Sequence, residues 1–218
     1  MRWPFTRRRT KVTQTLNPQA AYALWAPTYP AQAHNALMAL EQQTVLSMLP
    51  DLAGLTVLDV GCGSGRYLRE LRDRGATPMG LDLSEAMLAK ARAIARQVAR
   101  ANLCALPIRS MSVDVMVSGL ALGDVPNLEM ALVEMARALR PGGCVVYSVV
   151  HPVGATAGWS RTFEAAGRRV AIDSYWHSVA DHRRACAAAG LRVTAWEEPV
   201  LTEAPEHPAV LVVRAARS

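Results

Sequence analysis

The stretch TVLDVGCGSGRYLREL, residues 56–71, joins a short apolar segment to an amphipathic one through a turn that contains three glycines. Thr56 to Val60 has the apolar, β-branched character of a buried strand, and Arg66 to Arg74 has the pattern of a helix that stops at Gly75. Glycines let the backbone turn with positive φ and approach a ligand closely, because they carry no Cβ atom. The stretch therefore predicts a strand, a ligand-binding loop and a helix in succession.

The spacing of the acids and glycines narrows the kind of ligand. Dinucleotide-binding loops use the spacing G-x-G-x-x-G, whereas here Asp59 precedes glycines at positions 61, 63 and 65. A second acid, Asp82, ends the next predicted strand, where a carboxylate can accept hydrogen bonds from both ribose hydroxyls of either kind of cofactor. Asp82 is alternatively a helix-entry residue beside the capping Ser84.

Short apolar runs alternate with longer amphipathic stretches along the chain, which is typical of a parallel sheet flanked by helices. The predicted strands are Thr56–Val60, Thr77–Leu81, Val113–Ser118, Cys144–Val150, Leu191–Trp196 and Val210–Val213, with a weaker one at Val98–Leu103. The predicted helices are Asn35–Leu49, Arg66–Arg74, Ser84–Ala95, Leu128–Leu139 and Ser178–Ala189. We predict an α/β fold with a doubly wound, Rossmann-like sheet of seven strands, mostly parallel with an antiparallel C-terminal strand. Ligands of such sheets bind beyond the carboxyl ends of the strands.

Length and composition favour a single domain. With 218 residues, 51% of them apolar, the chain can bury one substantial core. We expect a basic flexible tail over residues 1–15 and one domain over residues 16–218. Within that domain, residues 16–50 are expected to form a helical cap. Residues 151–177, which are poor in helix and strand signals, are expected to form an insertion or lid on the substrate side.

Composition also limits the partners and the compartment. No apolar run approaches the roughly 18 to 20 residues that span a bilayer, so we expect a soluble protein with no membrane partner. The four cysteines are widely separated and show no C-x-x-C spacing, which favours reduced thiols in a cytoplasm and no metal site. The net charge of +6 is spread over several predicted helices, which argues against a nucleic-acid partner. We expect a monomer or a homodimer.

Four motifs resemble those of a known enzyme family. They are VLDVGCGSG (57–65), GLDLSEAMLAKAR (80–92), ALPIRSMSVDVMVS (105–118) and ALVEMARALRPGG (131–143). Their order and intervals resemble those of the class I S-adenosylmethionine-dependent methyltransferases, in particular the small-molecule group that includes the ubiquinone/menaquinone and malonyl-carrier methyltransferases. The resemblance implies S-adenosylmethionine as the cofactor and in-line transfer of its methyl group to a small-molecule acceptor.

The resemblance also implies which residues hold the cofactor. The loop glycines would let the backbone approach its methionine portion, Asp59 would order the loop, and Asp82 would hold the ribose. Met87 would pack on the adenine or belong to the core. Asn102 stands where the family usually has Asp, and it keeps one acceptor oxygen for the adenine amino group. The implied set is Tyr22, Asp59, Gly61, Cys62, Gly63, Asp82, Leu83, Met87, Asn102, Leu103 and Ser118.

Aromatic residues are expected to form the acceptor pocket, because their rings can clamp an apolar or planar molecule. The segment YALWAPTY, residues 22–29, resembles the N-terminal aromatic segment of the small-molecule group, which covers the methionine end of the cofactor. The predicted substrate-pocket residues are Trp25, Tyr29, His34 and Tyr175, with Trp159, Trp176 and His177 as further candidates. Gly123 and Asp124 occupy positions where relatives often carry a histidine pair.

Methyl transfer needs a protein base only when the acceptor loses a proton as it attacks. His151 is the predicted catalytic base, because it directly follows a strand and titrates near neutral pH. Alternatively, His151 only bonds a turn that is fixed by Pro152.

Three other functions remain open from the sequence. The basic N-terminus suggests an RNA or protein methyltransferase, although the chain lacks the Asn/Asp-Pro-Pro-aromatic signature that looks typical of enzymes acting on amino groups of bases or glutamine. The departures at Asn102 and at Gly123 and Asp124 suggest a non-catalytic module that binds S-adenosylmethionine. A nicotinamide-dependent oxidoreductase would share the fold, but the glycine spacing disfavours it.

Overall fold

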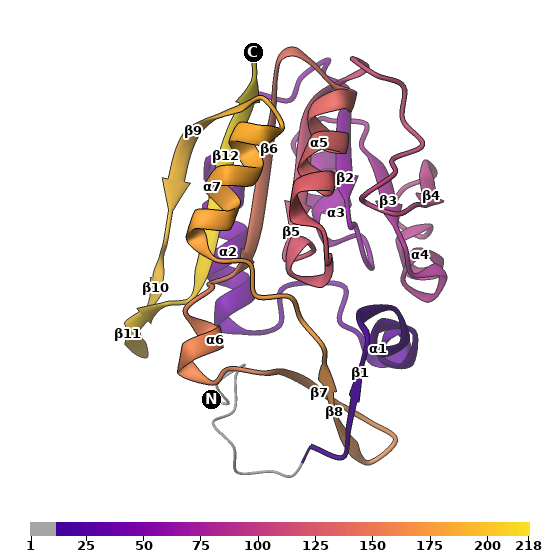
Figure 1. Ribbon diagram of the computed structural model, residues 1–218. Helices are drawn as coiled ribbons and strands as arrows, with labels where there is room; N and C mark the ends of the chain where they lie inside the picture. Colours follow the sequence, from indigo (N-terminus) through magenta and orange to yellow (C-terminus); the bar gives the residue numbers. More distant parts are fainter. Residues whose placement is uncertain (1–11) are drawn as a thin grey trace.

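A seven-stranded sheet forms the centre of the protein in the computed structural model, which describes residues 12–218 (Figure 1). The strand order is β4-β3-β2-β5-β6-β12-β9. The bounds are β2 Val57–Val60, β3 Met79–Asp82, β4 Val98–Arg100, β5 Val113–Gly119, β6 Leu139–Val150, β9 Leu191–Glu197 and β12 Val210–Arg217. Strand β12 runs antiparallel between β6 and β9, and the other pairs of neighbours run parallel. This confirms the predicted fold class.

The chain runs outward from β2 to β4 and then returns to the opposite side of β2 to form β5. Their shared register pairs Leu58 with Met79 of β3 and with Met116 of β5. Ligands of doubly wound sheets bind at the carboxyl ends of the strands where the order reverses. The glycine loop that follows β2 lies at this point of reversal.

Helices cover both faces of the sheet. They are α1 Pro18–Trp25, α2 Ala36–Ser47, α3 Arg66–Asp73, α4 Glu85–Ala91, α5 Leu128–Ala138, α6 Gly154–Ala157 and α7 Val179–Ala188, with short 3₁₀ turns η1 Ala26–Thr28 and η2 Leu122–Asp124. Side chains of Asn35, Ser84, Asn127 and Ser178 accept hydrogen bonds from backbone N–H groups in the first turns of their helices. The predicted helices are found one to several residues shorter.

Two apolar layers pack on the opposite faces of the sheet, because successive strand residues point to opposite sides. Leu211 of β12 packs with α5 and α7, whereas its neighbour Val212 packs with α2 and α3. The same alternation separates Leu58 from Val57 in β2. No helix in the described residues is both long enough and apolar enough to cross a membrane.

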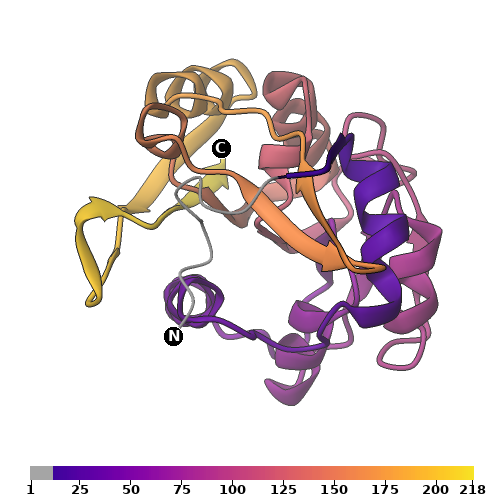
Figure 2. The ribbon, with the colours of Figure 1, turned by 90° about the horizontal axis from the view of Figure 1, so that it is seen from below.

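A second, three-stranded sheet lies across the carboxyl end of the first (Figures 1 and 2). Strand β1, Gln14–Leu16, pairs in parallel with β8, Arg168–Ile172, which pairs with β7, Arg161–Ala165. Residues 1–11 of the predicted tail lie outside the described residues. The tail prediction is wrong for Gln14 and Thr15, because these residues pair with a strand more than 150 positions away.

Two elements depart from the predicted pattern near β6 and β9. Strand β6 begins at Leu139, directly after α5, so it includes Pro141, Gly142 and Gly143, which lie before the predicted start of this strand at Cys144. A hairpin of β10 Val200–Leu201 and β11 Ala204–Pro208 was not predicted.

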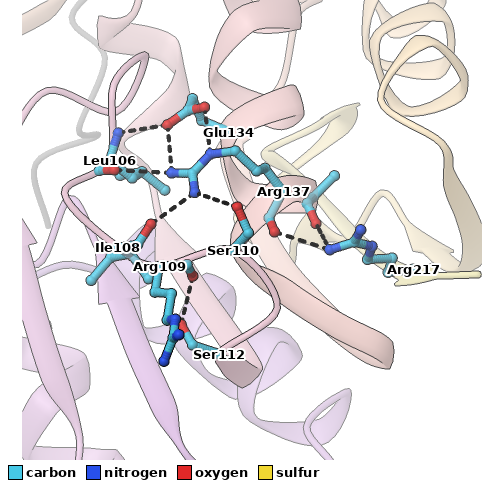
Figure 3. Close-up of polar contacts among 9 residues, drawn as sticks. Leu106, Ile108, Arg109, Ser110, Ser112, Glu134, Arg137 and Arg217 are labelled. Atoms are coloured by element: carbon cyan, nitrogen blue, oxygen red, sulfur yellow. Dashed lines mark hydrogen bonds and ion pairs between the residues drawn. The ribbon is translucent and has the colours of Figure 1, made fainter.

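Arg137 of α5 fixes the loop that follows β4. Its guanidinium pairs with Glu134 at 2.8 Å and donates to the carbonyl oxygens of Leu106 at 3.0 Å and Ile108 at 2.8 Å (Figure 3). Arg217 of β12 donates to the carbonyl of Arg137 at 3.0 Å, which satisfies a group at the end of α5 that lacks a partner within the helix. These bonds hold the loop against α5.

We predict that Leu211→Ala lowers the free energy of unfolding by about 2 to 5 kcal/mol, because it empties a fully buried site between β12 and the helices. Met130→Ala on the exposed side of α5 is the control and is expected to change stability by less than about 0.5 kcal/mol. Chemical denaturation measures both variants. Equal small effects would contradict the placement of Leu211 in the core.

Candidate cofactor and acceptor site

A cavity of about 500 Å³ lies between the carboxyl ends of the strands and the cap formed by α1 and the second sheet. The glycine loop, the ends of β3 and β5, and the loop after β4 line it from the main sheet. Residues of α1, of the segment that leads to α2, and of β7 line it from the cap. Segments from the beginning, middle and later part of the chain therefore enclose one space.

The glycine loop turns sharply beside β3. Gly61 and Gly63 have φ values of 77° and 53°, which favour glycine. The N–H groups of Gly61 and Cys62 both donate to the carbonyl of Leu81, at 2.7 and 2.9 Å. A Cβ atom on Gly61 would lie 2.4 Å from the Cβ of Ala121, so this position also needs glycine for packing.

Asp82 connects the loop to the end of β3. Its Oδ2 accepts from the N–H of Gly63 at 2.8 Å, and its Oδ1 accepts from the N–H of Ser84 at 2.7 Å. Burial raises the pKa of Asp82, and these two backbone donors oppose the rise. The side chain lines the cavity. Asp82 therefore orders the loop, and each of its oxygens keeps a further lone pair.

Asp59 lies beneath the glycine loop and is almost fully buried. Neither carboxylate oxygen has a hydrogen-bond partner that meets normal geometry among residues 12–218. Burial raises the pKa of Asp59 to about 8; Arg66 opposes the rise and Asp82 adds to it. Near neutral pH the carboxyl group is therefore largely protonated.

The predicted adenine-side residues all line the cavity. Met87 and Leu103 are buried and line it, whereas Leu83 and Asn102 are exposed at its edge. The Oδ1 of Asn102 accepts from the N–H of Cys104 at 2.9 Å, so it fixes its own turn. One lone pair of this oxygen remains.

Aromatic residues of the cap also line the cavity. Trp25 packs edge-on against Tyr29 at 4.7 Å between ring centroids and stacks on Phe163 of β7 at 4.6 Å. His34 lies 6.0 Å from Tyr29. The ammonium of Lys90 donates to the carbonyls of Ala26 and Tyr29, at 2.6 and 2.7 Å, and anchors this segment on α4. Tyr22, Trp25, Tyr29 and His34 all line the cavity.

A buried ion pair that the sequence did not predict lies beside the cavity. Arg66 lines the cavity at the start of α3 and pairs with the fully buried Glu41 of α2 at 2.8 Å. Glu41 also accepts from the hydroxyls of Tyr67 at 2.8 Å and Ser148 at 2.5 Å. Burial raises the pKa of Tyr67, and the charge of Glu41 raises it further. No signal in the sequence marks Glu41 as buried, because its partners come from other elements.

A second ion pair, also missed, joins the cap to the loop after β5. Arg161, the first residue of β7, pairs with Asp124, and the Oδ2 of Asp124 accepts from the hydroxyl of Tyr22 at 2.9 Å. Arg161 also donates to Tyr22 and, at 3.3 Å, to Ser174. Burial raises the pKa of Tyr22 well above its usual value, with Arg161 opposing the rise. The sequence marked Asp124 only as a departure from the family pattern.

Several predicted site residues do not line the cavity, and the buried Asp59 is one of them. Ser118 is fully buried within β5. His151 accepts from the N–H of Val153 at 3.2 Å and lies 3.3 Å from Glu198, so its side chain bonds the turn instead of facing the cavity. Tyr175 lines a smaller neighbouring hollow. The described residues contain no group of three His, Cys, Asp or Glu side chains that could hold a metal ion.

Comparison with known proteins places the fold in a family. The chain is similar to an S-adenosylmethionine-dependent methyltransferase from Mesorhizobium loti, with 30% identity and a TM-score of 0.69 over 81% of this chain and 97% of that one. The chain belongs to the class I S-adenosylmethionine-dependent methyltransferases. A family model described as a methyltransferase domain matches residues 58–147.

Two curated relatives of this methyltransferase cover less of the chain. A malonyl-[acyl-carrier protein] O-methyltransferase of Enterobacter lignolyticus is 37% identical over 60% of this chain and 52% of its own length. A demethylmenaquinone methyltransferase of Lactococcus lactis is 33% identical over 51% of this chain and 50% of its own. The chain thus spans about half the length of these relatives. The family cofactor is S-adenosylmethionine, which excludes the nicotinamide alternative.

We predict that stability falls between about pH 4 and pH 8 because of Asp59. In the unfolded chain the carboxyl of Asp59 loses its proton near pH 4, whereas in the folded protein it keeps the proton to about pH 8. The free energy of unfolding therefore decreases as the pH rises between these two values. Asp59→Asn should remove this pH dependence. Between pH 5 and pH 8 the free energy of unfolding of the wild type should therefore fall by on the order of 3 kcal/mol more than that of the variant.

Denaturant titrations of the cofactor-free protein at several pH values measure the difference. Asp51→Asn changes an exposed carboxyl outside the cavity and is the matched control. Parallel pH profiles for the wild type and Asp59→Asn would show that Asp59 is ionised in the folded protein.

Proposed function

We propose that this protein is an enzyme that transfers the methyl group of S-adenosylmethionine to a small-molecule acceptor. The observation that carries the proposal is one cavity that is lined both by the glycine loop with Asp82 and by the aromatic residues of the cap. A pocket of this size suits a nucleoside cofactor together with a small acceptor. The acceptors named for the two curated relatives agree with a small-molecule substrate.

The residues present fit the cofactor. Among residues 12–218 the buried carboxyl of Asp59 has no hydrogen-bond partner of normal geometry, as expected for a group that a bound ammonium, directly or through water, would satisfy. We assign the ribose hydroxyls to the remaining lone pairs of Asp82, and the methionine portion to the backbone of Gly61, Cys62 and Gly63. The carboxylate of the cofactor suits the guanidinium of Arg66.

We assign the adenine to the other end of the glycine loop. Met87 and Leu103 offer apolar surface for the ring, with Leu83 at the edge. The free lone pair of Asn102 suits the adenine amino group. The aromatic cap, including Tyr22, lies over the methionine side.

When bound, the cofactor supplies an electrophilic methyl group on a sulfonium. The protein accelerates such a displacement mainly by holding the acceptor in line and by excluding water. Tyr22, Trp25, Tyr29 and His34 provide the walls that do this, and Lys90 holds them in place. His151, the predicted base, bonds the turn that follows β6 and does not line the cavity. The proposed reaction therefore does not use His151.

Asp82→Ala is expected to weaken binding of S-adenosylhomocysteine by about 1.5 to 3 kcal/mol, because it removes charge-assisted hydrogen bonds and releases Gly63. Calorimetric titration measures the change. Asp73→Ala, an exposed carboxyl at the end of α3, is the control and should bind as the wild type does. If Asp82→Ala binds S-adenosylhomocysteine as tightly as the wild type does, the assignment of the ribose to Asp82 is wrong.

Gly63→Ala and Gly75→Ala form a matched pair. Both glycines have positive φ and open space around a built Cβ, so both substitutions should cost roughly 1 to 2 kcal/mol of stability. Only Gly63 lines the cavity, so only Gly63→Ala should weaken S-adenosylhomocysteine binding, by about tenfold or more. Equal affinities would mean that the cofactor does not approach this backbone.

A further inference from the structure

Arg161 is a cavity-lining cation that cofactor binding does not use in the assignment above. Only 15% of its side chain is exposed, and it begins β7 in the cap. Its Nη atoms bond Asp124, Tyr22 and Ser174. Among residues 12–218, the Nε–H has no hydrogen-bond partner. Arg161 therefore lines the cavity and keeps one donor that no described residue engages, while Asp124 fixes the orientation of its guanidinium.

Arg161 lines a second hollow as well as the main cavity. A second hollow of about 20 Å³ adjoins the cavity and shares Arg161, Leu120 and Val150 with it. No residue of the glycine loop or of the end of β3 lines this second hollow. Arg161 thus lies where the main cavity adjoins the second hollow, beside Tyr22 of the cap.

We propose that Arg161 binds a carboxylate of the methyl acceptor and that this carboxylate is the group methylated. The inference rests on the proposed function. A guanidinium presents a planar set of donors that matches a carboxylate, and such charge-assisted bonds are strong in a partly desolvated site. Asp124 offsets the cost of burying the arginine, and its own oxygens are already engaged by Arg161 and Tyr22.

The chemistry agrees with the groups around Arg161. A carboxylate oxygen attacks the methyl carbon, a C–O bond forms as the C–S bond breaks, and the electron pair of that bond stays on sulfur. The products are a methyl ester and S-adenosylhomocysteine, and no proton is lost. A carboxylate acceptor therefore needs no base, whereas a phenol or an ammonium must lose a proton.

The nearby groups offer little base capacity. Asp124 is held in its ion pair, and burial raises the pKa of Tyr22 and of Tyr29. His34 is the cavity-lining group that remains, and burial lowers its pKa. Phenol methylation through His34 is the competing outcome that the experiment must separate.

The first test uses wild-type protein saturated with S-adenosylhomocysteine. Octanoate and phenylacetate are titrated beside octanamide and phenylacetamide, which have the same shapes without the charge. We expect saturable binding of a carboxylate at least about tenfold tighter than its amide. Equal binding of acid and amide, or no saturable binding of either acid, overturns the proposal.

The second test assigns the preference to Arg161. Asp124→Asn/Arg161→Gln removes both charges, so no buried charge is left unpaired, and it should bind the carboxylates about 10- to 100-fold more weakly. Arg168→Gln, an exposed arginine in the same hairpin, is the matched control. Unchanged carboxylate affinity in the double variant overturns the assignment. If that variant does not fold, Arg161→Lys takes its place, because it keeps the charge and loses the planar fork.

The third test follows the product. Wild-type enzyme with tritium-labelled S-adenosylmethionine should convert the bound acid to a methyl ester, which releases volatile label in mild alkali. Alkali-stable label on 4-methylphenol, with none on the acids, overturns the carboxylate proposal but leaves the methyltransferase function intact. Failure to bind S-adenosylhomocysteine at all is a different result, because it removes the proposed function on which the inference rests.

Discussion

The hydrogen bonds between the glycine loop and the end of β3 are the constraint on which the site depends. Leu81 and Asp82 together hold the N–H groups of Gly61, Cys62 and Gly63. A loop with alternating glycines would otherwise have a large conformational entropy, so these bonds select one shape. Because β3 supplies both acceptors, the loop takes this shape only when the parallel pairing of β2 and β3 is complete.

The same arrangement explains why Asp59 is tolerated under the loop. A buried carboxyl without a partner reduces stability, and it remains where binding requires it. Burial keeps it largely protonated near neutral pH in the cofactor-free protein. A cationic group of a ligand would favour the ionised form, so binding of such a group would be coupled to loss of the Asp59 proton.

Two ion pairs fix the positions of the elements that surround the cavity. Glu41 and Arg66 join α2 to α3. Asp124 and Arg161 join the loop after β5 to β7 of the cap. Ion pairs in partly desolvated sites add little net stability but fix geometry, since a misplaced partner leaves a charge unpaired. The aromatic walls, anchored by Lys90, therefore rest on elements whose positions are set by charge pairing.

The sequence by itself determined the sheet and the cofactor end of the site. These predictions rest on local signals: the periodicity of the strands, the residues that begin and end the helices, and the spacing of Asp59, the glycines and Asp82. The structure has the strands and helices near the predicted positions, and the glycine loop and Asp82 line the cavity. The acceptor end was decided by tertiary structure. Strand β1 exists only beside β8, and Arg161 meets Tyr22 from 139 positions away. Burial and charge pairing of this kind depend on three-dimensional neighbours, so His151 looked suited to the cavity while Glu41 and Arg161 passed unnoticed.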